Sequence, residues 1–434
     1  MESRPEIEFH PKLSPRVLKV DRALYRLARK CKILYYINPV NSAVEKAKFL
    51  ERYRRGKKYA PHFKYRPIPF EVSSTISELS QLDKLLDGSE LGELYRRKID
   101  ELNTQLLLLN TVGDTQKFMG YSIALYGTPA HGHLADVKPL DVARIWLSAP
   151  RNTEDRCIPP VSDNPLEWTV QKDLLDEALY YGFPCSIRVK DHLSSNAAAG
   201  EQSISLRRGI LYSRKESLRL KVHEVGFHLL TTFNARQHPL RIFEIGTPGY
   251  LADQEGGAIW AEEESRAITN HRLAVLGART VGIHMAVGGA CFWDVFDAMV
   301  TEHGFDEEDA YYVCERVFRG GVYTKDAIYQ KGYYNVRSHV RFGLVDPYVF
   351  INGKIGIDAV PLVKALMEEE ILVRPRYIPR FLQDADWIHS WKTLSATSDL
   401  HRGDAFRRQH RLAEDELAAP GFGLPDPKLV LLKP

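Results

Sequence analysis

Apolar side chains recur at helical spacing along most of the chain. Leu18, Leu24, Leu27 and Ala28 follow this period in the first such segment, and Pro39 ends that segment because proline breaks a helix. The spacing predicts helices over residues 14–36, 41–53, 72–86, 89–110, 254–271 and 358–371, with further helices up to about residue 340.

A shorter period marks residues 184–208. Residues 185–189 and 203–207 alternate between polar and apolar side chains, which predicts two strands joined by the small, polar segment 194–202. A loop rich in Pro and Gly is predicted at 239–249, and a loosely packed tail at the Pro- and Gly-containing end of the chain. The fold class predicted by this pattern is α+β, mostly helical, with a small β-sheet.

Composition places the chain among ordinary globular proteins. The 434 residues are 44% hydrophobic and 26% charged. The five cysteines are far apart and include no Cys-x-x-Cys pair, which favours a reducing compartment over a disulfide framework. Met1 is followed by a polar stretch rather than by the apolar core of a signal peptide, and the weakly polar stretch 280–293 is too short to span a membrane. We therefore expect a soluble, cytoplasmic protein without a membrane partner.

Charge is distributed unevenly. Residues 1–66 hold 18 Lys and Arg against 6 Asp and Glu, a net charge of +12, whereas the remainder carries −9. This basic arm either neutralises the body of the protein or attracts an acidic partner such as a peptide tail. Its densest run is Arg52, Arg54, Arg55, Lys57 and Lys58. No nucleic-acid-binding motif accompanies these residues, so we expect no nucleic-acid partner.

Residues 221–230, Lys-Val-His-Glu-Val-Gly-Phe-His-Leu-Leu, carry the pattern with the most chemical meaning. In zinc peptidases two imidazoles on one helix hold the metal, and a Glu beside the first activates water. The usual spacing of the two His is four residues, but His223 and His228 are five apart. On a regular helix, a spacing of five residues points His228 about 140° away from His223 around the helix axis, whereas a spacing of four would leave about 40° between them. Two readings stay open: two partly buried core histidines, or a metal site on a helix with a one-residue π-type bulge, which Gly226 would ease.

Residues 253–258, Asp-Gln-Glu-Gly-Gly-Ala, offer a third ligand, as a catalytic zinc requires. Glu255 stands at a predicted helix start, where an acid is also favourable for the helix itself. The two following glycines permit close backbone approach. Glu262, seven residues further on, lies on the same face and is predicted to orient an imidazole.

Another histidine pair, His131-Gly132-His133, has only Asp136 close by. We predict a loop turn there rather than a second metal site.

The two motifs together resemble the flavohemoglobin expression-modulating QEGLA motif proteins, a family that includes the tyrosine carboxypeptidases that trim the C-terminal tyrosine of tubulin. Further segments look like family landmarks in the family's order, and the resemblance covers about residues 9–341. These landmarks are Asn38-Pro39-Val40-Asn41, Phe63-Lys64-Tyr65, Tyr126-Gly127-Thr128-Pro129, residues 234–239 and Tyr323-Thr324-Lys325-Asp326-Ala327-Ile328-Tyr329.

The resemblance implies a zincin-like metallopeptidase with one Zn²⁺ per chain. It makes His223, His228 and Glu255 the zinc ligands and Glu224 the general base. The family more often has Thr where Phe227 stands and Leu where Gly257 stands, and we expect both departures to reshape the substrate pocket. The implied organisation is a basic helical region (1–110) packed on a catalytic domain (111–345), followed by a helical extension and tail (346–434).

A metallocarboxypeptidase needs further groups. Tyr329 or His284 could donate to the oxygen that becomes negative during hydrolysis, and Lys325 or Arg207 could bind the terminal carboxylate. The strand at 203–208 could pair with an extended substrate. The predicted activity is removal of the C-terminal residue, tyrosine first, from a peptide or protein tail, acidic tails included. Two alternatives stay open: an amino- or endopeptidase with the same metal set, and a non-catalytic zinc-bearing regulatory protein.

Overall fold

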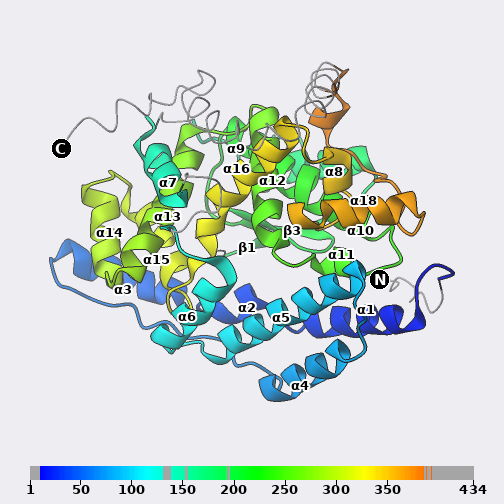
Figure 1. The fold of residues 1–434 in the computed structure, drawn as a ribbon. Coiled ribbons are helices and arrows are strands. Elements are labelled where there is room, and N and C mark those ends of the chain that lie inside the picture. The colour runs from blue at the N-terminus through cyan, green and yellow to red at the C-terminus, as the bar shows by residue number, and fades with distance from the viewer. Residues whose placement is uncertain are drawn as a thin grey trace.

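The structure is a computed structural model that describes residues 10–130, 138–151, 155–191, 193, 196–385, 388 and 392. The predicted turn at 131–133 and the predicted C-terminal tail lie outside these residues. Helices dominate and the sheet is small, so the predicted mostly helical α+β class is confirmed (Figure 1). Among the described residues, no helix has the length and apolar character needed to cross a membrane.

The N-terminal helices lie together along one side of the molecule (Figure 1). They are α1 (Pro15–Ala28), α2 (Ile33–Ile37), α3 (Ser42–Arg54), α4 (Val72–Asp83), α5 (Glu90–Asn110) and α6 (Thr115–Tyr126). The single helix predicted for residues 14–36 is wrong, because the chain turns between α1 and α2. Leu24 and Leu27 of α1 belong to the main core, whereas Tyr36 and Ile37 of α2 belong to a separate cluster.

The middle of the chain forms the next group of helices. They are α7 (Pro139–Ser148), α8 (Val170–Tyr181), α9 (Arg214–Leu220), the π-helix η1 (Lys221–Leu229), α10 (Leu230–Ala235), α11 (Ile242–Ile245) and α12 (Tyr250–Glu264). Of these, η1 contacts β2 (Ala197–Ala199) and α8 contacts β1 (Ser186–Lys190). The predicted helix 254–271 begins earlier and ends earlier than expected. Arg266 has a φ of 52°, a left-handed conformation that ends the helix, and the Thr269 hydroxyl then caps α13.

The remaining helices complete the body of the molecule. They are α13 (Asn270–Val287), α14 (Phe292–Thr301), α15 (Glu307–Phe318), the 3₁₀ turn η2 (Thr324–Ala327), α16 (Ile328–Arg341), α17 (Pro347–Phe350), the 3₁₀ turn η3 (Ile357–Ala359), α18 (Val360–Glu368) and the 3₁₀ turn η4 (Arg380–Gln383). The predicted helix 358–371 corresponds to η3 and α18.

The sheet has three strands in the order β1-β3-β2. Both predicted strands are present, as β1 (Ser186–Lys190) and β3 (Ser203–Arg207), and they pair in parallel with Ser186 opposite Ser203. The third strand, β2 (Ala197–Ala199), pairs antiparallel with β3. β3 is therefore central and both of its edges are occupied, so the prediction that it pairs with a substrate is wrong. The open edges in the described sheet belong to β1 and β2.

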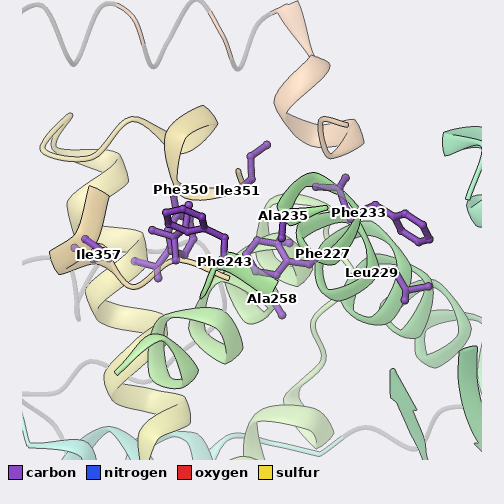
Figure 2. Packing of buried hydrophobic residues seen from close by; sticks show 14 of the residues in the cluster. Phe227, Leu229, Phe233, Ala235, Phe243, Ala258, Phe350, Ile351 and Ile357 are labelled. Atoms are coloured by element: carbon purple, nitrogen blue, oxygen red, sulfur yellow. The ribbon is translucent and has the colours of Figure 1, made fainter. Parts of the chain in front are cut away.

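One large hydrophobic cluster contains side chains from Leu13 to Leu382. Figure 2 shows part of it, where Phe227 lies near Phe350 and Ala258. All three predicted regions of the chain contribute residues to this cluster, and the division into domains stays a prediction.

Candidate metal centre

The first histidine segment lies on η1, which continues directly from α9. Ser213 and Glu216 form a capping box at the start of α9, which fixes where the helix begins. In a π-helix each N–H bonds to the carbonyl five residues earlier, so residues five apart come to the same side. The predicted helix distortion is confirmed, and the π-helical stretch is longer than the single bulge expected. It brings the rings of His223 and His228 within 4.6 Å, centroid to centroid.

Three ligand atoms converge at this point. Nε2 of His223 lies 3.1 Å from Nε2 of His228, and each lies 3.8 Å from Oε2 of Glu255 on α12. The edges of a tetrahedral zinc site with bonds of about 2.0–2.1 Å measure about 3.3–3.4 Å. The triangle of His223, His228 and Glu255 is therefore of the right size to bind a metal ion.

Each imidazole is held at its other nitrogen. Nδ1 of His223 donates to Oε1 of the fully buried Glu262 at 2.7 Å, which leaves the lone pair of Nε2 facing the triangle. This contact is the one predicted for Glu262. The Gln254 amide lies 3.4 Å from Nδ1 of His228 and donates to the Thr231 hydroxyl. The sequence analysis did not identify Gln254, although its position next to Glu255 was a usable signal.

Two arginines behind the histidines balance the charge of Glu262. Nη2 of Arg272 and Nη1 of Arg219 lie 3.4 and 3.7 Å from Oε1 of Glu262. Burial raises the pKa of the Glu262 carboxyl, but the two guanidinium groups and the imidazole outweigh burial and lower that pKa to about 2. Glu262 therefore stays ionised and keeps accepting from His223.

Glu255 is fixed by a lysine. The Lys325 ammonium donates to Oε1 of Glu255 at 2.7 Å and to the Tyr329 hydroxyl at 3.0 Å, which leaves Oε2 facing the imidazoles. Burial opposes ionisation of Glu255, yet the Lys325 charge prevails and the pKa of the carboxyl falls to about 2. Burial and the nearby His223 lower the pKa of His228 to about 3, so its imidazole is neutral near pH 7.

Two glycines, Gly256 of α12 and Gly332 of α16, let these two helices come close together. A Cβ on Gly256 would lie 2.0 Å from the carbonyl carbon of Gly332 on α16, and a Cβ on Gly332 would lie 1.8 Å from the carbonyl oxygen of Ala252. The backbones of the two helices therefore meet where neither residue has a side chain. This confirms the predicted close approach, and it sets the position of Glu255.

Glu224 is buried beside the triangle. The backbone N–H of Ala199, at the end of β2, donates to Oε2 of Glu224 at 2.8 Å. Burial raises the pKa of the Glu224 carboxyl, which brings it closer to the range in which a carboxylate exchanges protons near neutral pH.

These groups line a cavity of about 730 Å³. His223, Glu224, His228 and Glu255 line it together with Lys325, Tyr329 and Arg207, so the structure brings the sequence-predicted catalytic and binding residues to one cavity, except Glu262 and His284. His284 is not among the residues that line it.

Two of the predicted cations already have partners. Lys325 is bound to Glu255, as described above. Arg207 donates to Glu308 at 2.9 Å and to the Tyr312 hydroxyl, and its guanidinium lies 4.0 Å from the centre of the Tyr312 ring. Lys325 is therefore neutralised by Glu255, whereas Arg207 is hydrogen-bonded but shares the Glu308 carboxylate with Lys46.

The basic run 52–58 is not part of the cavity lining. Arg54 pairs with Glu307, and Lys58 lies 3.8 Å from Asp294. These pairs favour the interpretation that the basic arm neutralises acids of the body.

Comparison with known protein families shows to which family the chain belongs. The family described as "Microtubule-associated tyrosine carboxypeptidase" matches residues 47–399. The chain belongs to this family. The match begins later than the resemblance seen in the sequence and extends further towards the C-terminus. A search of curated proteins finds no match.

Phe227 and Gly257, the two departures noted in the sequence, do not line the cavity. Phe227 is fully buried, and its ring packs against Gly257 and Phe350 (Figure 2). Neither departure therefore changes a side chain that lines the cavity, and an effect on the shape of the pocket stays a prediction.

Proposed function

We propose that this protein is a zinc-dependent carboxypeptidase of zincin-like architecture that removes the C-terminal residue of a cytoplasmic peptide or protein tail. One observation carries the proposal: two Nε2 atoms and one carboxylate oxygen converge beside a buried glutamate in one cavity. Membership of a carboxypeptidase family supports the reaction class.

The residues present fit zinc. Two imidazoles and one carboxylate are a ligand set found in catalytic zinc sites. The hydrogen bond from His223 to Glu262 selects the tautomer that ligation needs. When bound, zinc polarises a carbonyl group and lowers the pKa of a water molecule.

Glu224 is the proposed general base. Its carboxylate takes a proton from the attacking water and passes it to the leaving amine. The Ala199 N–H holds one carboxylate oxygen and leaves the other free for this transfer. A pure structural metal site would have no use for such a group, which argues against a non-catalytic role.

Tyr329 is the proposed donor to the carbonyl oxygen of the scissile bond. Its hydroxyl accepts from Lys325, so its own proton remains available for a further acceptor. In this account Lys325 positions Glu255 and Tyr329 instead of binding the terminal carboxylate. Arg207 remains a candidate for contact with the substrate at the cavity wall.

Tyrosine is the proposed preferred residue. A second hollow of about 710 Å³ adjoins the first, shares Glu255 and Lys325 with it, and is lined by Tyr126, Tyr250 and Tyr323. Aromatic walls suit an aromatic side chain. The open edge of β2, which also lines the first cavity, could pair with the extended chain that precedes the released residue.

The test is a panel of peptides that differ only in their last residue, incubated with zinc-loaded protein and analysed by mass spectrometry. We expect loss of one C-terminal residue, fastest for tyrosine. Internal cleavage, or release from the N-terminus, would instead identify an endo- or aminopeptidase. Absence of zinc in protein purified without chelators would contradict the metal site.

A further inference from the structure

One face of α13 forms a wall of the cavity described above. Arg272, Val275 and Arg279 follow at spacings of three and four residues and all line the cavity, as expected for one side of a helix. Arg272 interacts with Glu262. Arg279 lies two turns further along the same wall.

Arg279 carries a charge that the protein does not fully neutralise. Its side chain is only 12% exposed, and its nearest acid is Asp326, with Nε 3.7 Å from Oδ2. In the described part of the chain, no hydrogen bond to the guanidinium is found, and the buried Nε has no acceptor. Asp326 already accepts from Nε and Nη2 of Arg316 at 2.6 and 2.9 Å. One carboxylate thus faces two guanidinium groups, and one positive charge remains beside the cavity.

Burial and the charge of Arg316 lower the pKa of Arg279 to about 9, which still leaves it charged near pH 7. An unpaired buried cation is costly unless an anion joins it. A guanidinium also offers paired donors that match the two oxygens of a carboxylate.

Arg279 is linked to the proposed metal ligands through two neighbouring residues of η2. Its partner Asp326 follows Lys325 in the chain, and Lys325 is bound to Glu255. The terminal carboxylate of a substrate is one residue beyond its scissile carbonyl. The group that binds this carboxylate must therefore lie in the same cavity as the proposed ligands, as Arg279 does.

We propose that Arg279 binds the α-carboxylate of the C-terminal residue of the substrate and thereby makes the enzyme an exopeptidase. This inference rests on the proposed carboxypeptidase function. Arg279 takes this role in place of Lys325 and Arg207, because the ammonium and the guanidinium of those two residues already donate hydrogen bonds within the protein.

One other cation is the main competitor for this role. Lys354 lines the same cavity, but burial lowers the pKa of its ammonium to about 8, and Glu244 and Glu201 face it. Two acids already oppose the charge of Lys354, whereas Arg279 shares its one acid with Arg316, so the geometry favours Arg279.

The experiment compares two peptides that end in tyrosine, one with a free carboxylate and one amidated. Wild-type protein is expected to favour the free acid strongly. Arg279→Gln should lower kcat/KM for the free acid on the order of 100-fold and leave the amidated peptide nearly unaffected. Arg279→Lys keeps the charge but loses the paired donors. Its kcat/KM for the free acid should lie between the values of the wild type and of Arg279→Gln.

Binding provides a readout that does not need turnover. In a Glu224→Gln background, labelled peptides titrated by fluorescence anisotropy should show that Arg279→Gln abolishes the preference for the free acid. Arg208→Gln serves as a matched control, because Arg208 also lines the cavity but pairs with Asp191. Its variant should keep the preference, as should Lys354→Met.

Zinc content and thermal unfolding of each variant show whether it is folded. A preserved preference in Arg279→Gln, or its loss in Lys354→Met instead, would overturn the inference. If zinc-loaded wild-type protein cleaves no peptide, the proposed function fails, but the anisotropy comparison still decides whether Arg279 binds a carboxylate.

Discussion

The ring of Phe227 fills the space that a side chain at position 257 would occupy. A Cβ atom on Gly257 would lie 2.3 Å from Cζ of Phe227, well inside van der Waals contact. The two residues that depart from the usual family pattern are therefore complementary: one is large where its neighbour is small. Because both lie in the core, neither departure changes a side chain of the cavity wall.

Substitution of Phe227 and Gly257, singly and together, should show that their contributions to the free energy of unfolding depend on each other. Phe227→Thr alone removes a buried ring and should lower the free energy of unfolding by about 3 kcal/mol. Gly257→Leu alone overfills the site and should lower it by about 2–3 kcal/mol. The double variant should recover most of both losses, which corresponds to a coupling energy of about 1–3 kcal/mol. Urea unfolding of the four proteins measures this directly, and strictly additive losses would contradict the complementarity.

The contact between α12 and α16 leads to a second prediction. Gly256→Ala would place a Cβ 2.0 Å from the Gly332 backbone, so the helices must separate and Glu255 must move. We expect lower stability and weaker zinc binding, measured by thermal unfolding and chelator competition. Gly120→Ala is the control, because a Cβ added to Gly120 of α6 would meet no atom within 4 Å. It should leave zinc affinity unchanged and stabilise the helix by up to about 1 kcal/mol. Equal zinc affinity in both variants would argue against this role of Gly256.

Glu262 should strengthen zinc binding through its hydrogen bond to His223, although it is not itself a proposed ligand. Glu262→Gln removes the negative charge that holds Nδ1 of His223 at 2.7 Å. Loss of such a partner typically weakens metal affinity about 10–100-fold. Competition with a zinc chelator measures the change, and far-UV circular dichroism confirms that the variant is folded. An unaltered dissociation constant would mean that His223 does not ligate through Nε2.

Lys354 should make stability depend on pH. Burial lowers the pKa of its ammonium from 10.5 to about 8 in the folded protein. Between these values the unfolded chain binds more protons than the folded one, so stability should rise as pH increases from about 8 to 9.5. The gain has an upper bound of about 1.4 kcal/mol per pH unit. Lys354→Met should show a smaller rise in urea unfolding over this range, and an identical rise in both proteins would contradict the effect.

Many helices were predictable because their signals are local, such as Ser89, which caps α5 with its side chain. The proposed ligands were named through the resemblance of the two motifs to a known family, because the five-residue spacing of the two histidines left a core role open. β2 was missed because its three alanines have no strand preference. β3 was expected to be open to a substrate, since the sequence does not say that β1 and β2 flank it.

Contacts between residues far apart in the chain could not be predicted from the sequence. Lys325 was recognised as a cation, but its partner Glu255 is 70 residues away in the sequence. Because this pairing could not be seen, Lys325 was interpreted as a group that binds the substrate. Arg279 gave no signal, because an arginine on a helix is ordinary until its neighbours are known. Gly257 was interpreted as a change to the pocket, since the sequence does not reveal that Phe227 lies against it.

Replacement of Glu224 by glutamine tests the central claim most directly. The substitution keeps the shape of the side chain but removes the proposed base, and it leaves all three proposed zinc ligands in place. Zinc content by elemental analysis and release of tyrosine from a C-terminal tyrosine peptide are measured on the same preparations. We predict one zinc per chain in both proteins, and a loss of kcat on the order of 1,000-fold or more in Glu224→Gln. Undiminished release of tyrosine by Glu224→Gln, or no zinc in either protein, would contradict the account.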